Sequence, residues 1–300
     1  MSSLGSSLVP PALLDGGYPR FRRDELSRRR AALLSAAGER GVDVVLLAGV
    51  DRTGSAVQWL TEWPVTREAY VVVDAEHPDA LFVQFYNHVP LARELARNAA
   101  VAWAGPSALG TVLAELRRRG TAGGPLGVVG PLPHGVRRGL VDAGFEPIDL
   151  NADYTGIRLV KSSEEVEWLR IGAALSDAGI EALASGLRSG LTEWDLADLP
   201  ERAYVPHGGT THIHYFGVTP MAAPVRANPA QHLSFRQVEP GDAVTVELSA
   251  AFWGHPGQVL RTFAVEADPS PQYAEMHAVA EAASTRSPRR CGTGRPRRRF

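Results

Sequence analysis

The sequence predicts an α/β protein in which a three-layer α/β domain is followed by a smaller α+β domain. Two observations lead to this prediction. In the first half, short apolar runs alternate with amphipathic segments, which is the pattern of helices packed on both faces of a sheet. In the second half, a long amphipathic segment and a shorter one precede two strand-like runs that form a hairpin.

The first half begins with residues 1–20, which are rich in Ser, Gly and Pro and are expected to form a flexible arm. Residues 42–47 are almost wholly apolar, as expected of a buried strand. The other predicted strands cover residues 69–74, 80–85, 101–103, 126–129 and 147–150, and the helices cover residues 21–40, 88–98, 108–119 and 135–143. These elements make up an N-terminal domain over residues 21–155.

A second domain is expected over residues 156–283. Ser162-Ser163-Glu164-Glu165 is an N-cap pattern that starts a long helix, and Thr192 caps a shorter one. The chain that follows, from His207, is expected to be irregular and strand-like. It leads into the hairpin, and a last helix is predicted over residues 273–283.

The hairpin at residues 239–263 carries the polar residues of greatest interest. Pro240-Gly241-Asp242 is a turn signature, and in the strand over residues 243–248 alternate apolar side chains share one face. Glu247 lies on the opposite face, and Gln258 begins the second run. A buried carboxylate is costly unless it is paired, hydrogen-bonded or bound to a metal, so Glu247 requires an explanation.

Composition limits the class of protein. The chain has 300 residues, of which 44% are hydrophobic and 21% are charged, and its formal net charge is −2. These values indicate a globular protein and argue against a general nucleic-acid binder. Cys291 is the only cysteine, which excludes an intramolecular disulfide and a cysteine-cluster metal site. Because no signal peptide or membrane-spanning run is recognisable, we expect a cytoplasmic protein without a membrane partner.

The end of the chain, residues 284–300, differs from the rest because it is Arg/Pro-rich and has no periodicity. We expect it to be disordered. Two alternatives remain open at this point: an arm that binds nucleic acid or another anionic partner, and the product of a shifted reading frame. Of these, nucleic-acid binding is not the expected role.

Four short motifs carry a resemblance to a known family. They are Arg158-Leu159-Val160-Lys161-Ser162, Ser189-Gly190-Leu191-Thr192-Glu193, Pro240-Gly241-Asp242 and Arg261-Thr262-Phe263. In this order and spacing the chain resembles the creatinase/Xaa-Pro aminopeptidase family over residues 21–283. The resemblance implies a creatinase-type N-terminal domain followed by the first half of a pita-bread domain, in a chain that is truncated at its C-terminus relative to the family.

The resemblance also bears on metal binding. Metal-dependent members of the family hold a dinuclear site with two Asp from this hairpin and with a later His and two Glu. Glu247 and Gln258 stand at the two Asp positions, and the later ligands have no counterpart. A neutral Gln cannot replace an anionic ligand. We therefore expect no metal ligands and no cofactor, the alternative being a divalent metal such as Mn or Co if other groups complete the site.

Creatinase works without a metal and uses a His for proton transfer, which makes His232 the nearest candidate here. An ungapped match places Ala230, rather than His232, at that position. We therefore expect His232 and Glu247 as catalytic residues, and the substrate-binding residues are expected to be His214, Gln258 and Arg261.

Two alternative roles remain open for these side chains. His212 and His214 are two residues apart and would share a face of a strand, so with Glu247 they would suit an unrelated metal site. Glu247 would otherwise form a structural ion pair with Arg261 on the neighbouring strand.

Two functions follow from these expectations. The first is a hydrolase of small peptides, amides or guanidino compounds that works without the usual dinuclear metal site, as a homodimer with a small-molecule or short-peptide substrate. The second is a non-catalytic or incomplete homologue that acts as a binding or scaffold protein. The sequence leaves open whether the chain is an enzyme.

Overall fold

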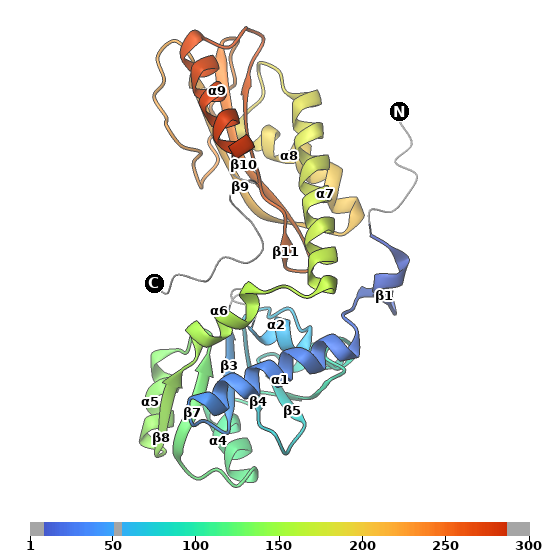
Figure 1. Cartoon of the computed structure of the whole chain (residues 1–300), viewed down its shortest axis with the longest axis vertical. Helices are drawn as coiled ribbons and strands as arrows, with labels where there is room; N and C mark the ends of the chain where they lie inside the picture. Colours follow the sequence, from blue (N-terminus) through green and yellow to red (C-terminus); the bar gives the residue numbers. More distant parts are fainter. Residues whose placement is uncertain (1–8, 51–55, 287–300) are drawn as a thin grey trace. The chain divides into compact units, whose positions relative to one another are not determined.

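The computed structural model describes residues 9–50 and 56–286, which fall into two compact units (Figure 1). One unit comprises residues 10–167, and the other contains the chain from Trp168 onward. The long helix α7 (Ser163–Gly186) begins in the first unit and continues into the second.

The unit over residues 10–167 is built on a six-stranded sheet with the strand order β6-β5-β4-β3-β7-β8. Strands β3, β4 and β5 are antiparallel neighbours, whereas β3, β7 and β8 run parallel, as do β5 and β6. The strands are β3 (Val45–Val50), β4 (Glu68–Val73), β5 (Asp79–Val83), β6 (Ala99–Trp103), β7 (Gly124–Val129) and β8 (Phe145–Asp149). The three central strands are almost completely buried, which accounts for their continuous apolar sequences.

Helices cover both faces of this sheet and give it three layers. Figure 1 shows α1 crossing one face, whereas α4 and α5 lie on the other. The helices are α1 (Arg23–Glu39), α2 (Ala56–Thr61), α3 (Val89–Leu95), α4 (Ala108–Arg118), α5 (His134–Asp142) and α6 (Asn151–Leu159). One core cluster joins side chains from the sheet, such as Leu46 and Phe82, to Leu116 of α4 and Leu140 of α5. The three-layer α/β prediction is therefore confirmed.

A buried ionic cluster fixes α1 to the start of α7. The side chain of Arg29 is 1% exposed. It donates to Glu25 Oε1 at 2.7 Å, to the Trp59 carbonyl at 2.8 Å and to Glu165 Oε1 at 3.3 Å. Its guanidinium also lies 3.9 Å from the centroid of the Phe21 ring. The buried charge is thus fully paired, as burial requires.

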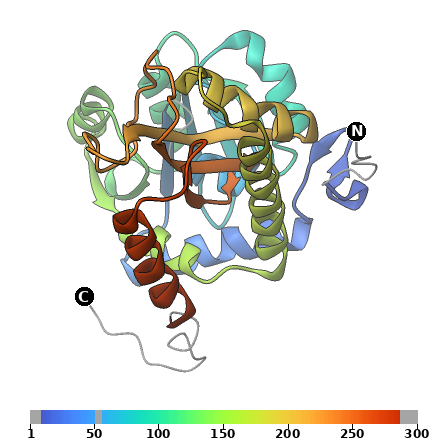
Figure 2. The same cartoon turned by 90° about the horizontal axis from the view of Figure 1, so that it is seen from above.

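The second unit packs two helices on one face of a four-stranded sheet. Its core combines Leu183 of α7 and Leu196 of α8 with apolar side chains from the central strand, such as Val246. The elements after α7 are α8 (Glu193–Tyr204), β9 (Gly209–Pro220), β10 (Asp242–Phe252), β11 (His255–Pro256), β12 (Val259–Ala264) and α9 (Pro271–Arg286). Over residues 271–285 helix α9 carries no buried residue, and it lies apart from α7 (Figure 2).

Strand β10 is the centre of this sheet. It pairs antiparallel with β9 along its whole length on one side and with β11 and β12 on the other. Trp253 and Gly254 join β10 to β11 with φ values of 48° and 83°, the positive-φ pair that a type I′ hairpin turn needs. The residue after β11, Gly257, packs closely on α7, because a Cβ at this position would lie 2.4 Å from Ala173 Cα.

Several local expectations change with the structure. The segment expected to be irregular after His207 is largely the regular strand β9, because pairing with β10 satisfies its backbone. The region expected around the domain boundary forms helix α6. Residues 9–20, part of the expected arm, contain a 3-10 turn (Pro11–Leu13) and the two short strands β1 (Leu14–Asp15) and β2 (Tyr18–Pro19).

The predicted tail lies mostly outside the described residues. Helix α9 continues to Arg286, and residues 287–300 are not described. None of the described helices is both long and apolar enough to cross a lipid bilayer.

Candidate functional site

Glu247 and Gln258 are brought together on the hairpin, as their positions predict. Glu247 lies on β10, opposite Leu260 of β12 and Tyr215 of β9. Gln258 immediately precedes β12, and its Nε2 donates to Glu247 Oε1 at 2.5 Å. The carboxylate is therefore satisfied by a neutral amide, and the pair remains accessible on the sheet surface.

The two faces of β10 have different chemistry. Val244, Val246 and Leu248 belong to the core beneath α7 and α8. The alternate positions, Thr245 and Glu247, face the other way. On that second face, which we call the open face, Leu260 is 57% exposed and Thr245 is partly buried. Glu247 thus lies beside both an apolar and a hydroxyl side chain.

Arg261 does not reach the Glu247 carboxylate. It is paired in register with Val246, which places it on the opposite face of the sheet from Glu247. Its Nη1 donates to the Leu260 carbonyl at 2.8 Å. The suggested Glu247–Arg261 ion pair is therefore wrong, because neighbouring residues of a strand point to opposite faces.

His214 also lies away from Glu247. It is in register with Leu248, so its side chain lies on the core side of the sheet, and that side chain is only 6% exposed. Its Nε2 is 2.9 Å from the hydroxyl of Tyr204 in α8, and its Nδ1 is 3.4 Å from Glu201 Oε1. Burial lowers the pKa of His214, although the nearby Glu201 carboxylate acts in the opposite direction.

A β-bulge explains why His212 and His214 do not share a face. The pairing of β9 with β10 shifts between Ser249 and Ala250, so that His212 has no partner and Thr211 pairs with Ala250. As a result Thr211, rather than His212, accompanies His214, and the Thr211 hydroxyl lies 2.6 Å from the Tyr204 hydroxyl. The expected shared face was wrong because period-two alternation fails at a bulge.

His232 lies in the connection between β9 and β10 and is exposed. Shortly before it, Ala230 forms an isolated antiparallel bridge with Phe216 of β9. A Cβ on Gly217 would lie 3.3 Å from the Asn228 carbonyl oxygen. Gly217 is paired with Thr245, so the Cα position of Gly217 faces the open face. The close approach of Asn228 therefore places the segment that leads to His232 beside the open face.

The same connection is anchored on both sides of His232 by Glu193, whose side chain is 0% exposed. Glu193 accepts a hydrogen bond from Arg226 Nη1 at 2.9 Å and from the backbone N–H of Ser234 at 2.6 Å. Sequence reasoning missed this role, since an acidic residue directly after the N-cap Thr192 is ordinarily solvent-facing.

A second anchor follows at Asp242, which was expected to be mainly a turn residue. Arg236 donates to its two oxygens at 2.7 and 2.9 Å, and the Glu239 N–H donates to it at 2.8 Å. The Asp242 side chain is 2% exposed. Asp242 therefore fixes the end of the connection as well as the turn into β10.

The side chains present do not fit a dinuclear metal centre. The two positions on the hairpin hold one carboxylate and one amide, and these are hydrogen-bonded to each other. Within the described residues, no group of three or more His, Cys, Asp and Glu side chains is arranged to hold a metal ion. The alternative site formed by two histidines and Glu247 is excluded by the opposite placements of His214 and Glu247.

Comparison with known proteins finds a matching family model and two related sequences. Residues 167–296 match metallopeptidase family M24. The chain is 26% identical over 200 residues to a creatinase from Bacillus sp. (strain B-0618), which covers 65% of this chain and 48% of the creatinase. It is 29% identical over 124 residues to the uncharacterized peptidase YqhT from Bacillus subtilis, covering 41% of this chain and 34% of that protein. The chain thus spans half or less of these relatives.

Solved structures show the same fold over most of the chain. An Xaa-Pro dipeptidase from Bacillus anthracis superposes with a TM-score of 0.71 at 21% identity, covering 87% of this chain and 71% of that one. A prolidase from Thermococcus sibiricus gives a TM-score of 0.73 at 18% identity, with coverages of 93% and 75%. The predicted resemblance is confirmed: residues 167–296 match metallopeptidase family M24, and most of the chain shares its fold with part of the solved Xaa-Pro dipeptidase and prolidase structures.

Proposed function

We propose that the chain is a hydrolase of the creatinase and Xaa-Pro peptidase type that acts on small peptides, amides or guanidino compounds without a dinuclear metal centre. In this proposal Glu247 holds a cationic group of the substrate, and His232 transfers the proton. The observation that supports it most is the approach of Asn228 to Gly217, which brings the His232 segment beside the face that carries Glu247.

The chemistry assigned to these residues is general acid–base hydrolysis. An ammonium or guanidinium group would pair with Glu247, whose Oε1 already accepts a hydrogen bond from Gln258. The imidazole of His232 would take a proton from water as the oxygen attacks the scissile carbon. The bond between carbon and the leaving nitrogen would then break as the imidazolium returns the proton to that nitrogen.

Other side chains would position these groups. Glu193 holds the connection on both sides of His232, and Asp242 holds the end that leads into β10. We assign Gln258 to orienting the Glu247 carboxylate. The other two residues expected to bind substrate are His214 and Arg261. Both lie on the opposite face of the sheet from Glu247 and have no part in this step.

The test is hydrolysis by the purified full chain. Creatine, Xaa-Pro dipeptides and simple amides would be assayed with a chelator, and again with added Mn²⁺ or Co²⁺. We expect slow turnover that the chelator leaves unchanged and that Glu247→Gln and His232→Gln each abolish without lowering the melting temperature. Metal-stimulated dipeptide cleavage that survives in both variants would refute this proposal.

One observation favours the second candidate, a non-catalytic binding protein. The Glu247–Gln258 hydrogen bond leaves the hairpin with a satisfied, accessible carboxylate, which suits the binding of a cation as well as catalysis. Saturable binding of a guanidinium or ammonium probe that Glu247→Gln removes, with no turnover of any substrate, would favour this candidate.

The expected homodimer and cytoplasmic location are part of the same proposal. Helix α9 exposes Met276 and Val279 by 59% and 66%, and such apolar surface is commonly covered by a partner. Light scattering on the purified chain, with Met276→Glu as the disrupting variant, would test the dimer. Cell fractionation would test the location.

A further inference from the structure

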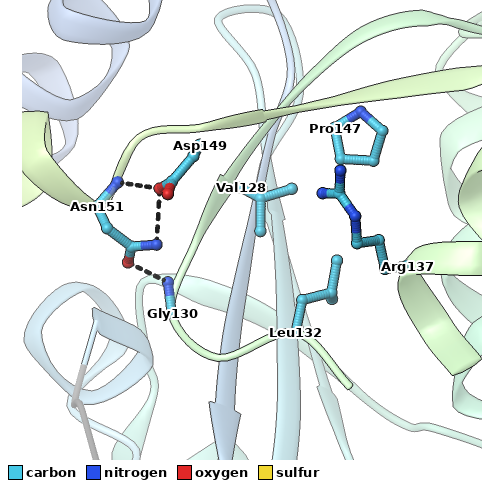
Figure 3. Close-up of a pocket in the computed structure, with 7 residues that line it drawn as sticks. All are labelled: Val128, Gly130, Leu132, Arg137, Pro147, Asp149 and Asn151. Carbon is cyan, nitrogen blue, oxygen red and sulfur yellow. Dashed lines mark hydrogen bonds between the residues drawn. The ribbon is translucent and has the colours of Figure 1, made fainter. Parts of the chain in front are cut away.

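A small hollow lies at one end of the six-stranded sheet, in the unit that does not contain Glu247. Its volume is about 180 Å³. It is formed beside the carboxyl ends of the parallel strands β7 and β8. The lining residues are Val128, Gly130, Leu132, Arg137, Pro147, Asp149 and Asn151 (Figure 3).

One side of the hollow carries a carboxylate held in a fixed position. Asp149 Oδ1 accepts hydrogen bonds from the backbone N–H and from Nδ2 of Asn151, both at 2.8 Å. Asn151 Oδ1 in turn accepts from the Gly130 N–H at 2.8 Å. No hydrogen bond within the described chain engages the second oxygen of Asp149, which is therefore available to a ligand.

The opposite side carries a cation. Figure 3 shows Arg137 of α5 beside Pro147, across Val128 and Leu132 from the Asp149–Asn151 pair. In the part of the chain that the structure describes, no ion pair or hydrogen bond holds the Arg137 guanidinium. The adjacent Arg138 differs, because its Nε lies 3.8 Å from Asp142 Oδ2 on the same helix.

The backbone around the hollow is closely fixed. Gly130 has a φ of 94°, and a Cβ at this position would lie 2.0 Å from the Ala48 carbonyl oxygen. The turn after β7 therefore requires glycine and lies directly against β3. The hydrogen bond from the Gly130 N–H to Asn151 also joins this turn to the residue that holds Asp149. The Asp149 carboxylate and the turn are thus preorganised for binding.

We propose that this hollow binds a small zwitterion of the free α-amino acid class. Arg137 would pair with the ligand carboxylate, and Asp149 would accept from its ammonium group. An aliphatic side chain would then lie on the apolar surface of Val128 and Leu132. At about 180 Å³ the hollow is smaller than the roughly 300–1,000 Å³ of pockets that hold drug-sized ligands, which fits one amino acid better than a peptide. This inference does not depend on the proposed hydrolase.

The experiment uses the full chain and three probes of similar size. L-leucine carries both charges, isocaproate lacks the ammonium group and isoamylamine lacks the carboxylate. Binding would be followed by calorimetry or by ligand-observed NMR. We expect saturable millimolar binding of leucine, and binding at least about tenfold weaker for each of the two singly charged probes.

Variants complete the test. Arg137→Gln and Asp149→Asn should each weaken leucine binding at least about tenfold. The matched control Arg138→Gln should leave it unchanged, since Arg138 is a neighbouring exposed arginine outside the hollow. Asp149→Asn keeps a side-chain oxygen for Asn151, and Arg137 is exposed, so both variants should fold.

Three results would overturn the inference. These are the absence of saturable leucine binding at tens of millimolar, equal binding of leucine and isocaproate, and equal losses in Arg137→Gln and Arg138→Gln. A hydrolase that remains fully active in Arg137→Gln would leave this inference intact, because Glu247 and His232 lie in the other unit.

Discussion

Gln258 donates from its Nε2 to Glu247 Oε1 at 2.5 Å, and this bond links β10 to the residue that precedes β12. Arg261, which is three residues further on, lies opposite Val246 and faces away. The carboxylate is therefore supported by an amide dipole and not by a positive charge. Among the described residues no cationic side chain pairs with Glu247, which leaves it open to a cationic ligand.

Replacing that amide by a carboxyl group should be costly at neutral pH. In Gln258→Glu two carboxyl groups would lie within hydrogen-bond distance, and both cannot ionise there without strong repulsion. The added group would have a raised pKa in the folded state, so the loss of stability should be small below about pH 4, grow as the pH rises past the unfolded pKa of about 4.3, and be complete above the raised folded pKa.

The measurement is urea unfolding of this variant at pH 7 and at pH 4. The matched control is Gln258→Met, which removes the hydrogen bond without adding charge and should cost about 1 kcal/mol or less at both values. A loss that is equal at the two pH values in Gln258→Glu would contradict the expected repulsion.

His214 should make stability fall on mild acidification. Because burial lowers its pKa in the folded state, the neutral imidazole stabilises the fold at high pH. This contribution is lost as the pH falls below the unfolded value of about 6.5. In His214→Gln the free energy of unfolding should therefore change less between about pH 7 and pH 5.

The control for this prediction is His212→Gln, which alters the exposed histidine two residues away. It should keep the pH dependence of the parent protein. If the profile of His214→Gln matched that of the parent, the titration would have to be assigned to other groups.

Glu193 should control the order of the connection that contains His232. In Glu193→Gln the charge opposite Arg226 is lost, and the hydrogen bond to the Ser234 N–H is weakened. We expect faster amide hydrogen exchange over residues 221–241 and a loss of about 1–3 kcal/mol in stability. Asp198→Asn, which disrupts an exposed ion pair on the same helix, should show neither effect.

Arg29 should be essential to the stability of the first unit. Replacing it by Met removes its hydrogen bonds to Glu25, Glu165 and the Trp59 carbonyl, whereas the two hydrogen bonds from Arg28 to Glu25 remain, so we expect a loss of roughly 1–3 kcal/mol. Denaturant unfolding would measure this loss, with the exposed Arg23→Gln on the same helix as the control. A loss below about 1 kcal/mol would show that the buried carboxylates are satisfied in another way.

Much of the fold could be predicted because its signals are local. Apolar runs identified the central strands, and the N-cap pattern at Ser162 together with Thr192 identified the starts of α7 and α8. The hairpin alternation also placed Glu247 on the face opposite Val246 correctly. These features depend on residues close in sequence, where periodicity and capping are informative.

The geometry of the site was less predictable because it depends on contacts between distant residues. The separation of His214 from Glu247 follows from the register of β9 on β10, and the exclusion of His212 follows from a bulge. The anchoring of Ser234 by Glu193 spans 41 residues. No single-sequence pattern encodes such long-range pairings.

The bulge at His212 also marks a position at which β9 could lose one residue. The residues on either side of it, Thr211 and Ile213, pair with Ala250 and Ser249, which are adjacent on β10. The ladder would therefore close with the same partners if His212 were deleted. Elsewhere in the strand, a one-residue deletion would turn every following side chain to the wrong face. His212 thus marks the point in β9 where natural variation in chain length would leave the Tyr204–His214 contact in place.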